Sequence, residues 1–503
     1  MGSAALSKRD RGAGRPMPES EEEEGVVAAL THEGEGVVRG GKTAFVLGAL
    51  QTERIRFRRT RRHKQHDDAR LVEILEPAAD RAVPRCAHFG VCGGCALQHL
   101  QPESQLAAKQ LELQETFERI GRVAPDEWLA PLRGPVWNYR RRARLGAKFV
   151  TKKDRVVVGF RERLSPYVAA LNRCEVLAAP VDSLIQPLSE MLTTLSIRER
   201  LPQIEVAVAD NAVALVMRVL SQPSESDLAT LRAFQQTHDV RLFLQPAGLD
   251  SIYRLSPSGS GRESGSGPLP PDPNGAAAKG TSSLPPDPGS PNPPASHPAE
   301  SPLVYRLPAF NLELEFTPTD FIQVNGPINQ SLVSRAVELL APEPDASVLD
   351  LYCGLGNFTL ALARKAGRVV GVEGDQALVA RAAANAHRNG ICNAEFYVAD
   401  LAQSVPVSAA SSPAWLNSAF PYILMDPPRA GAREMLPTVA RLAPKRVLYI
   451  SCHPGTLARD VGILVHDHGF TLRAAGVLDM FPHTTHVESL AVLEPGPSRS
   501  GGS

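Results

Sequence analysis

Cys452 has the sequence setting of a reactive cysteine. It follows the apolar run Val447–Ile450 and precedes a His-Pro-Gly turn. The apolar run predicts a buried strand, and we expect a helix to begin around Thr456. A cysteine at such a corner lies near a helix N-terminus, where unpaired N–H groups favour the thiolate over the thiol. Cys452 is therefore a candidate nucleophile; the alternative is a buried, inert cysteine, which is common inside cells.

Glu488 is a candidate proton acceptor. It stands before an apolar strand near the C-terminal end of the chain. We expect that strand to end in the same crevice as Cys452, where partial shielding from water would suit a carboxylate to take up a proton. The alternative is a structural salt-bridge partner.

Polar residues close four successive strands between residues 347 and 426. The first strand leads into Tyr352-Cys353-Gly354-Leu355-Gly356-Asn357, where the glycines let a ligand touch the backbone. The second strand ends at Glu373, placed to accept two ribose hydroxyls. Asp400 follows the third strand, near the expected adenine, and Asp426 begins Asp-Pro-Pro-Arg after the fourth. This arrangement predicts a Rossmann-like α/β domain and favours S-adenosylmethionine over a dinucleotide.

A methyl donor, a thiolate and a base together fit methylation of uracil at carbon 5. That carbon is too weak a nucleophile to attack a methyl sulfonium. A thiolate that adds to carbon 6 converts the ring to an enolate, and carbon 5 then attacks the methyl group. A base must afterwards remove the proton from carbon 5 so that the thiolate leaves, which assigns these roles to Cys452 and Glu488. The uracil must also leave its stack to reach a crevice.

Three further cysteines form a C-x5-C-x2-C segment, Cys86, Cys92 and Cys95, and Cys174 follows much later. Glycines in the segment let the backbone wrap a small inorganic centre, and a distant fourth ligand would complete four thiolates. Zinc also accepts four cysteines, but it usually pairs them as two knuckles, so the 3+1 grouping favours an iron–sulfur cluster. Radical enzymes usually use C-x3-C-x2-C and leave one iron open, so we expect a structural cluster.

The composition indicates several domains without a membrane span. The chain has 503 residues, is 43% hydrophobic, and balances 54 basic against 54 acidic residues. It has no run of 18 apolar residues and no apolar region at its N-terminus, so neither a membrane helix nor a secretory signal is expected. Seven cysteines, an odd number, fit a reducing compartment. We therefore expect a cytoplasmic protein. No obligate protein partner is predicted.

The expected domains follow shifts in composition along the chain. A disordered tail, 1–24, precedes a barrel of five short strands, 25–80, of the OB type. A central α+β domain, 81–255, carries the four cysteines. A disordered Pro-, Gly- and Ser-rich insert, 256–302, separates it from the catalytic domain, 303–495, and a tail follows at 496–503.

Two basic runs are candidates for contacts with RNA. One barrel strand and its extension carry Arg54, Arg56, Arg58, Arg59, Arg61, Arg62 and Lys64. The second run is Tyr139–Leu145, in which arginines stand beside an aromatic residue. Such density fits phosphates and splayed bases; for the barrel strand the alternative is a solvated charged edge.

With these motifs in place, the chain resembles the RNA uracil-5-methyltransferases over nearly its whole length, apart from the N-terminal tail and the 256–302 insert. The resemblance is to the bacterial iron–sulfur branch that acts on 23S ribosomal RNA. It is carried by the segments Cys86–Leu100, Tyr139–Leu145, Phe321–Asn325, Leu349–Thr359, Asp426–Ala432, Ser451–Asp460 and Leu478–Ser489.

The resemblance implies a TRAM-type barrel, a central cluster domain and a Rossmann-like catalytic domain. It implies a [4Fe–4S] cluster on the four cysteines, Cys452 as nucleophile and Glu488 as base. It also implies that S-adenosylmethionine is bound by Gln323, Tyr352, Asn357, Glu373, Asp400 and Asp426.

The chain departs from the family at three of these positions. His453 stands where the family usually has Asn, Tyr352 where it often has Phe, and Asp400 where a relative has Asn. Two alternatives stay open. One is the same reaction on transfer RNA or on another ribosomal uridine, and the other is a non-catalytic RNA-binding assembly factor with a cluster as scaffold.

Overall fold

The computed structural model describes residues 15–16, 21–257, 301–403, 413–416 and 418–497. Most of the predicted tail 1–24, nearly all of the insert 256–302 and most of the tail 496–503 lie outside these residues. The proposed domain limits stay predictions. Among the described residues, none of the helices is both long and apolar enough to cross a bilayer.

A closed β-barrel forms at the N-terminal end. Its strands are β2 (Glu23–Leu30), β3 (Glu35–Val38), β4 (Thr43–Leu47), β5 (Arg54–Arg62) and β6 (His66–Glu76), and the short β1 (Arg15–Pro16) adds to β5. The pairing runs β5-β2-β3-β4-β6, and β6 returns to β5 to close the barrel. Alternating apolar residues such as Val46, Ile55 and Phe57 fill its interior. The predicted five-stranded barrel is confirmed, with its first strand beginning two residues earlier than expected.

Acidic side chains neutralise much of the basic barrel strand. Ion pairs join Arg54 to Glu24 and Glu76, Arg56 to Glu24 and Glu73, Arg58 to Glu22, and Arg59 to Glu23 and Asp67. Arg61, Arg62 and Lys64 are exposed and have no ion-pair partner among the described residues. These three residues lie at the end of β5 and in the turn after it, and the RNA-contact role of the basic strand stays a prediction.

Three residues at the β5–β6 turn place ligand-type atoms within 4.8 Å of one another: His63, His66 and Asp68. The two rings stack at 4.4 Å, and His66 also stacks on Phe45 at 4.6 Å. Asp68 lies 3.1 Å from Nε2 of His63. Ring stacking and a hydrogen bond therefore explain why these three residues lie together in the barrel.

The middle of the chain forms a mixed six-stranded sheet with two helices on it. The strands are β8 (Arg142–Val150), β9 (Arg155–Gly159), β10 (Gln203–Val208), β11 (Val213–Arg218), β12 (Arg241–Gln245) and β13 (Tyr253–Arg254), and the helices are α2 (Val181–Thr194) and α3 (Glu225–His238). Their order in the sheet is β13-β12-β11-β10-β8-β9. Helix α3 begins with a capping box formed by Ser224 and Asp227.

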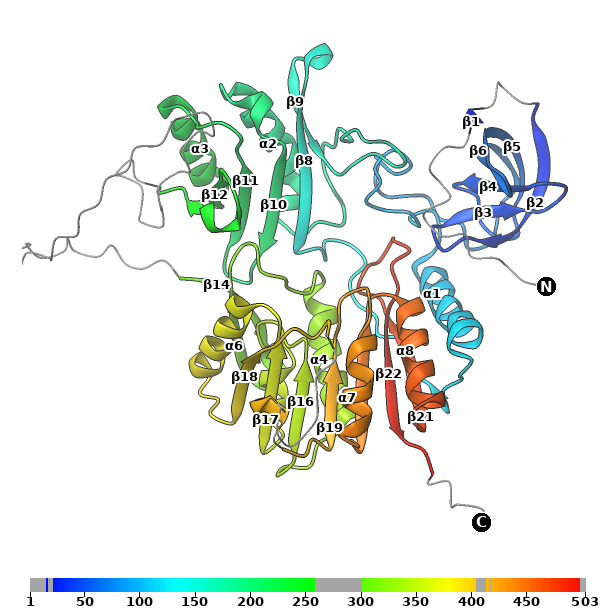
Figure 1. The fold of residues 1–503 in the computed structure, drawn as a ribbon. Coiled ribbons are helices and arrows are strands. Elements are labelled where there is room, and N and C mark those ends of the chain that lie inside the picture. Colours follow the sequence, from blue (N-terminus) through cyan, green and yellow to red (C-terminus); the bar gives the residue numbers. More distant parts are fainter. Residues whose placement is uncertain (1–14, 17–20, 258–300, 404–412, 417, 498–503) are drawn as a thin grey trace, which may run out of the picture.

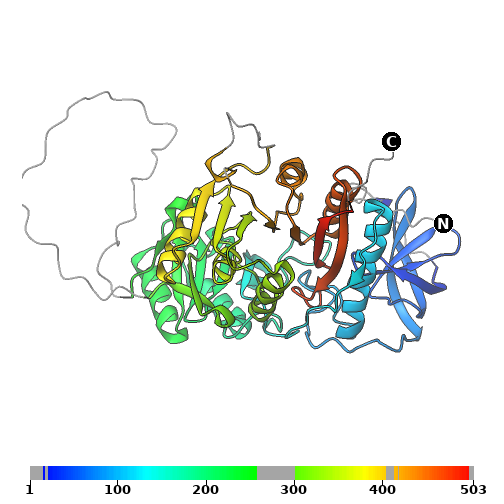
Figure 2. The same ribbon diagram turned by 90° about the horizontal axis from the view of Figure 1, so that it is seen from below.

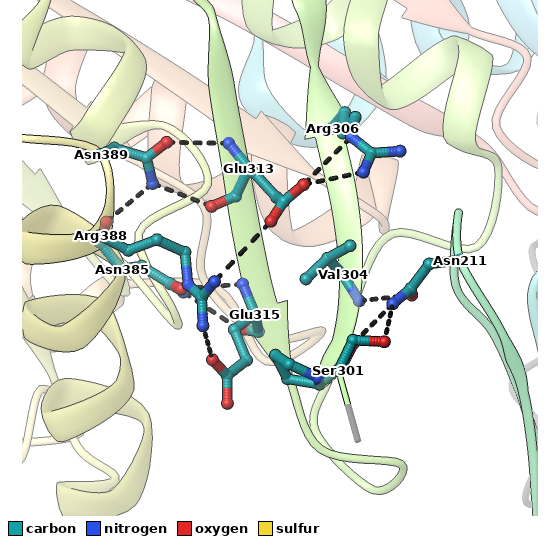
Figure 3. A network of polar contacts seen from close by, with 10 residues as sticks. Asn211, Ser301, Val304, Arg306, Glu313, Glu315, Asn385, Arg388 and Asn389 are labelled. Carbon is teal, nitrogen blue, oxygen red and sulfur yellow. Dashed lines mark hydrogen bonds and ion pairs between the residues drawn. The ribbon is translucent and has the colours of Figure 1, made fainter. Parts of the chain in front are cut away.

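A two-stranded hairpin, β14 (Leu303–Leu307) and β15 (Leu312–Phe316), joins the central sheet to the last part of the chain. Figure 3 shows side-chain amides that form hydrogen bonds with the backbone of this hairpin on both sides. On one side Asn211 accepts from the Val304 N–H at 3.1 Å. On the other, Asn389 accepts from the Glu313 N–H at 2.9 Å and Asn385 from that of Glu315 at 2.8 Å. The hairpin is thereby fixed to both parts.

The C-terminal part is an open α/β sheet. Its strands are β16 (Ser347–Leu351), β17 (Arg368–Glu373), β18 (Ala394–Val398), β19 (Tyr422–Met425), β20 (Arg446–Ser451), β21 (Phe470–Leu478) and β22 (Glu488–Pro495), with β7 (Glu127–Trp128) added at the edge. The order is β18-β17-β16-β19-β20-β22-β21-β7. The first five strands are parallel, and β22 is antiparallel to both of its neighbours. The predicted Rossmann-like fold is confirmed.

Helices cover both faces of this sheet. Val348 and Leu424 point to one face and pack with α4 (Gly326–Leu340), α5 (Thr359–Ala363) and α6 (Gln376–Arg388). Leu349 and Val447 point to the other face, which is covered by α7 (Leu436–Arg441), α8 (Pro454–His466) and α1 (Pro102–Thr116). Buried on both faces, the parallel strands are nearly continuous apolar runs, as the sequence indicated.

Helix α1 ties the N-terminal part to this sheet, although it precedes β16 by more than two hundred residues. Figures 1 and 2 show it between the barrel and the red strands β21 and β22. A π-helical turn, Phe117–Gly121, extends it and packs against α8. Helix α1 is therefore part of the packing of the C-terminal sheet, although it belongs to the N-terminal part of the chain.

Candidate active site

Cys452 and Glu488 meet at the ends of neighbouring strands. Ser451 is the last residue of β20 and pairs with Ser489, the second residue of β22. Because these strands are antiparallel, Cys452 and Glu488 are the next residues on each strand beyond that pair. Cys452 is half-buried and Glu488 is buried. The structure brings the predicted nucleophile and the predicted base into one corner.

The α8 N-terminus differs from the expectation. The helix begins at Pro454, and His453 is its N-cap, with Nδ1 accepting from the Thr456 N–H at 3.2 Å. The first helical residue has no N–H, and a later one is already bonded to the cap. Few free N–H groups are left to favour a thiolate at Cys452.

Charges around Cys452 act against ionisation. Burial and the carboxylates of Glu488 and Asp426 raise the pKa of the Cys452 thiol to about 11, and Arg429 opposes them. The expected thiolate is therefore not the favoured form in this state, because burial and two acidic neighbours outweigh the helix terminus. Arg429 was not among the predicted site residues; a cation within Asp-Pro-Pro-Arg at a strand end was the signal for it.

The two carboxyl groups of the site also hold their protons more tightly than usual. Burial raises the pKa of Asp426 to about 7. Burial and Asp426 hold the pKa of Glu488 well above its usual range, again opposed by Arg429. A carboxylate with a raised pKa is a better proton acceptor than an exposed one. This suits Glu488 to the role of base.

A buried aspartate fixes the loop that carries Asp426 and Arg429. Asp460 of α8 accepts from the Ala432 N–H at 2.8 Å, the Tyr449 hydroxyl at 2.7 Å and Nε of Arg459 at 2.7 Å. Three donors on one carboxylate make a rigid junction between β20, α8 and the loop after β19. The loop is therefore pre-positioned beside Cys452.

The glycine turn after β16 has the backbone conformation of the predicted ligand site, whose role stays a prediction. Tyr352, Gly354 and Gly356 have positive φ values of 66°, 54° and 96°. A Cβ built on Gly354 would meet nothing within 4 Å, so its backbone is open to a ligand. Glu373, the last residue of β17, accepts from the Gly354 N–H at 3.1 Å. The carboxylate thus lies against the turn, as the ribose-binding role requires.

The other residues predicted to bind S-adenosylmethionine differ in whether their polar groups already have hydrogen-bond partners. Nε2 of Gln323 lies 3.5 Å from Asp426, so these two are brought together. The amide of Asn357 is engaged with Asn329 through two bonds of 2.9 and 3.0 Å, which ties the turn to α4. Asp400 is exposed and accepts from Gln403 at 2.7 Å. The roles of these residues stay predictions.

Asp350 lies close to the candidate site but was not among the residues predicted from the sequence. It is fully buried in β16 and accepts from Thr359 at 2.5 Å. Burial, Asp426 and Glu373 raise its pKa to about 7. An aspartate inside an otherwise apolar strand was the available signal, because buried carboxyls need a specific partner.

The four cysteines of the predicted cluster line one pocket. Cys174 lies with the C-x5-C-x2-C segment, among Phe89, Phe160 and Leu171. Burial raises the pKa of Cys92 to about 11 and that of Cys95 to about 12, with neighbouring sulfurs adding to both. Gly94 donates to Sγ of Cys92 at 3.4 Å. Four sulfurs that line one apolar pocket need a cationic centre to become thiolates, which fits an iron–sulfur cluster.

Comparison with known proteins gives the family. Residues 308–495 match the family model described as tRNA (Uracil-5-)-methyltransferase. The chain is 46% identical over 469 residues to the 23S rRNA (uracil(1939)-C(5))-methyltransferase RlmD of Alkalilimnicola ehrlichii, covering 93% of this chain and 95% of the relative. The chain belongs to the RlmD family of uracil-5-methyltransferases.

Two further comparisons extend this result. The RlmD protein of Xanthomonas euvesicatoria is 44% identical over 472 residues, which covers 93% of this chain and 96% of the relative. Among solved structures, the Pyrococcus abyssi tRNA (uracil-54, C5)-methyltransferase in complex with S-adenosyl-L-homocysteine has a TM-score of 0.65 at 21% identity, covering 94% of this chain and 100% of that one. That likeness shows a shared fold, with the RlmD assignment resting on the sequence relatives.

Proposed function

We propose that this protein transfers a methyl group from S-adenosylmethionine to carbon 5 of a uridine in 23S ribosomal RNA. The observation that carries the proposal is the corner in which Cys452 and Glu488 end adjacent strands beside Asp426. The RlmD relatives, named for uracil(1939) of 23S rRNA, support the ribosomal substrate.

The chemistry assigns one step to each residue of the corner. The thiolate of Cys452 adds to carbon 6 of the uracil. Carbon 5 then attacks the methyl group, whose bond to the sulfonium sulfur breaks, so that S-adenosylhomocysteine leaves. Glu488 then takes the proton from carbon 5, the bond between carbon 6 and sulfur breaks, and the thiolate leaves as the ring double bond re-forms. Arg429 favours the anionic forms of Cys452 and Glu488 that these steps require. S-adenosylmethionine supplies the methyl group, and its sulfonium charge also favours the thiolate.

The four cysteines would hold a [4Fe–4S] cluster, whose contribution when bound is a cross-link of the segment 86–95 to Cys174. No reaction step is assigned to it. Protein isolated without oxygen should be brown, with about four irons per chain. A colourless protein that holds zinc would contradict this part of the proposal.

Replacement of Cys452 tests the mechanism. We expect Cys452→Ala to lose methylation of 23S RNA fragments by at least about a thousandfold, while RNA binding stays within about threefold, because the nucleophile touches only the reacting ring. Methyl transfer is followed with radiolabelled donor and binding by filter retention. An unchanged rate would refute the thiolate mechanism.

The target is tested separately from the mechanism. In a strain that lacks this gene, 5-methyluridine should be missing from one position of 23S RNA and present in transfer RNA. A loss confined to transfer RNA would assign the other substrate class. Unchanged 5-methyluridine in both RNAs would favour a role without catalysis.

A further inference from the structure

The loop between β21 and β22 leads directly into Glu488 and contains an unusual residue. His483 lies in this loop, is buried, and has φ of 64°. A left-handed conformation costs a non-glycine residue about 1 kcal/mol or more, so it persists only where the surroundings impose it. His483 is therefore held in place by its contacts.

The cysteine segment supplies the first of these contacts. The carbonyl of His483 accepts from the N–H groups of Ala96 and Leu97, at 2.8 and 3.0 Å. Ala96 directly follows Cys95, one of the four pocket cysteines. The peptide at the end of the cysteine segment is thus hydrogen-bonded to the loop that leads into the proposed base.

Helix α1 and the segment before β8 supply the rest. Gln105 accepts from the His483 N–H at 2.8 Å and lies 3.1 Å from its Nδ1. The Trp137 ring stacks on the imidazole at 3.9 Å, and the Tyr139 hydroxyl donates to the carbonyl of Pro482 at 3.0 Å. Burial, with Lys109, lowers the pKa of His483 to about 4, which favours the neutral ring. Because the Gln105 side-chain nitrogen can only donate, Nδ1 of the neutral ring can accept from it.

We propose that His483 is a positioning residue for Glu488, which links the geometry of the cysteine segment to proton removal from carbon 5. The proposal rests on the proposed function, in which Glu488 is the base. Glu488 acts after methyl transfer, so an ill-placed loop delays the release of RNA from Cys452 more than it delays methylation. His483 does not touch the reacting atoms.

The test follows the covalent enzyme–RNA species with ordinary uridine RNA and methyl donor. Loss of base positioning should slow release of the methylated adduct by about ten- to a hundredfold, the usual cost of a displaced group. His483→Ala should therefore accumulate methylated adduct on denaturing gels, with adduct formation within about threefold of wild type. His483→Asn should restore release, because asparagine tolerates a positive φ and supplies an acceptor.

Two further variants make the outcome decisive. Tyr139→Phe removes the hydrogen bond to the Pro482 carbonyl and keeps the aromatic ring. This variant should also accumulate methylated adduct, and it tests the proposal even if His483→Ala does not fold. His468→Ala changes an exposed residue and should release adduct like the wild type.

Hydrogen exchange provides a readout that does not depend on activity. In iron-replete His483→Ala protein, the amides of Ala96 and Leu97 should exchange faster than in the wild type, while those of α3 stay unchanged. Unchanged exchange at these two amides would contradict the link to the cysteine segment.

Glu488→Gln separates failure of this inference from failure of the proposed function. If Glu488→Gln accumulates methylated adduct but His483→Ala and Tyr139→Phe do not, His483 has no positioning role. If Glu488→Gln releases adduct at the wild-type rate, the base assignment itself is wrong.

Discussion

Cys452, Asp426 and Glu488 all have raised pKa values, for the shared reason that three acidic groups are buried at one corner. Arg429 is the cation that opposes this shift for Cys452 and Glu488. Both proposed chemical roles require anions, so the reaction rate should rise with pH as the Cys452 thiol and the Glu488 carboxyl group lose their protons. Burial and the acidic neighbours thus favour the protonated form of the proposed nucleophile, and the sulfonium charge of a bound donor would favour its ionisation.

The pH dependence of Cys452 alkylation tests this electrostatic balance. Glu488→Gln should move the alkylation profile toward lower pH by about one pH unit, since it removes a nearby negative charge. Arg429→Gln should move it toward higher pH. Peptide mass spectrometry of iodoacetamide-treated protein separates Cys452 from the exposed Cys392. Coincident profiles for all three proteins would contradict the proposed charges.

The raised pKa of Glu488 also makes a prediction for stability. Burial disfavours the ionised carboxyl in the folded state, whereas the unfolded chain ionises it freely, so this group destabilises the fold as the pH rises above its unfolded pKa. Glu488→Gln should therefore melt at a higher temperature than the wild type at pH 8. The difference should shrink as the pH falls toward 4.5, which calorimetry at both pH values would measure.

Apolar periodicity was enough to predict most of the elements that frame this corner. The strands β16, β17, β19 and β20 are mostly apolar runs, interrupted in β16 by Asp350, and the sequence alone showed which residue follows or ends each run. The hydrogen-bond and ion-pair partners of polar side chains could not be predicted, because the sequence pattern does not show which residues lie across a sheet or beside a helix. The pairing of Arg56 with Glu24, the engagement of Asn357 by Asn329 and the His453 cap all required the structure.

Between secondary-structure elements, Asp460 is the residue that holds the active-site loop after β19 to α8. Asp460→Asn removes the charge that accepts from three donors, and should cost about 2–3 kcal/mol in the free energy of unfolding. Methylation should fall as the loop loses its position. Asp467→Asn, at the exposed end of the same helix, is the matched control and should stay within about 0.5 kcal/mol of wild type in urea titrations. Equal effects of the two changes would deny Asp460 this role.

At the scale of the whole molecule, the N-terminal part of the chain helps to build the catalytic end. Lys109 of α1 donates to Asp479 at 2.8 Å and to the carbonyl of Phe481 at 3.0 Å, both beyond β21. Lys109 and Asp479 are buried. This ion pair joins α1, which follows the cysteine segment, to the loop between β21 and β22. These parts form one structural unit although they lie far apart in the sequence.

Breaking this ion pair should be costly. Lys109→Met leaves the Asp479 carboxylate buried without its cation, and should lower the free energy of unfolding by about 3–5 kcal/mol. The double variant Lys109→Met, Asp479→Leu should recover most of that loss, because it removes the stranded charge as well. Urea unfolding of the single and double variants gives the coupling energy, and strictly additive losses would mean that the two groups do not interact.

The covalent bond between Cys452 and RNA is the central claim of this account. Incubation with methyl donor and a 23S RNA fragment that carries 5-fluorouridine should give a denaturation-resistant complex, because fluorine at carbon 5 blocks proton removal. Peptide mass spectrometry should place the nucleotide on Cys452, and Cys452→Ala should form no complex. A complex that persists in Cys452→Ala, or its absence in wild-type protein that methylates ordinary RNA, would contradict the account.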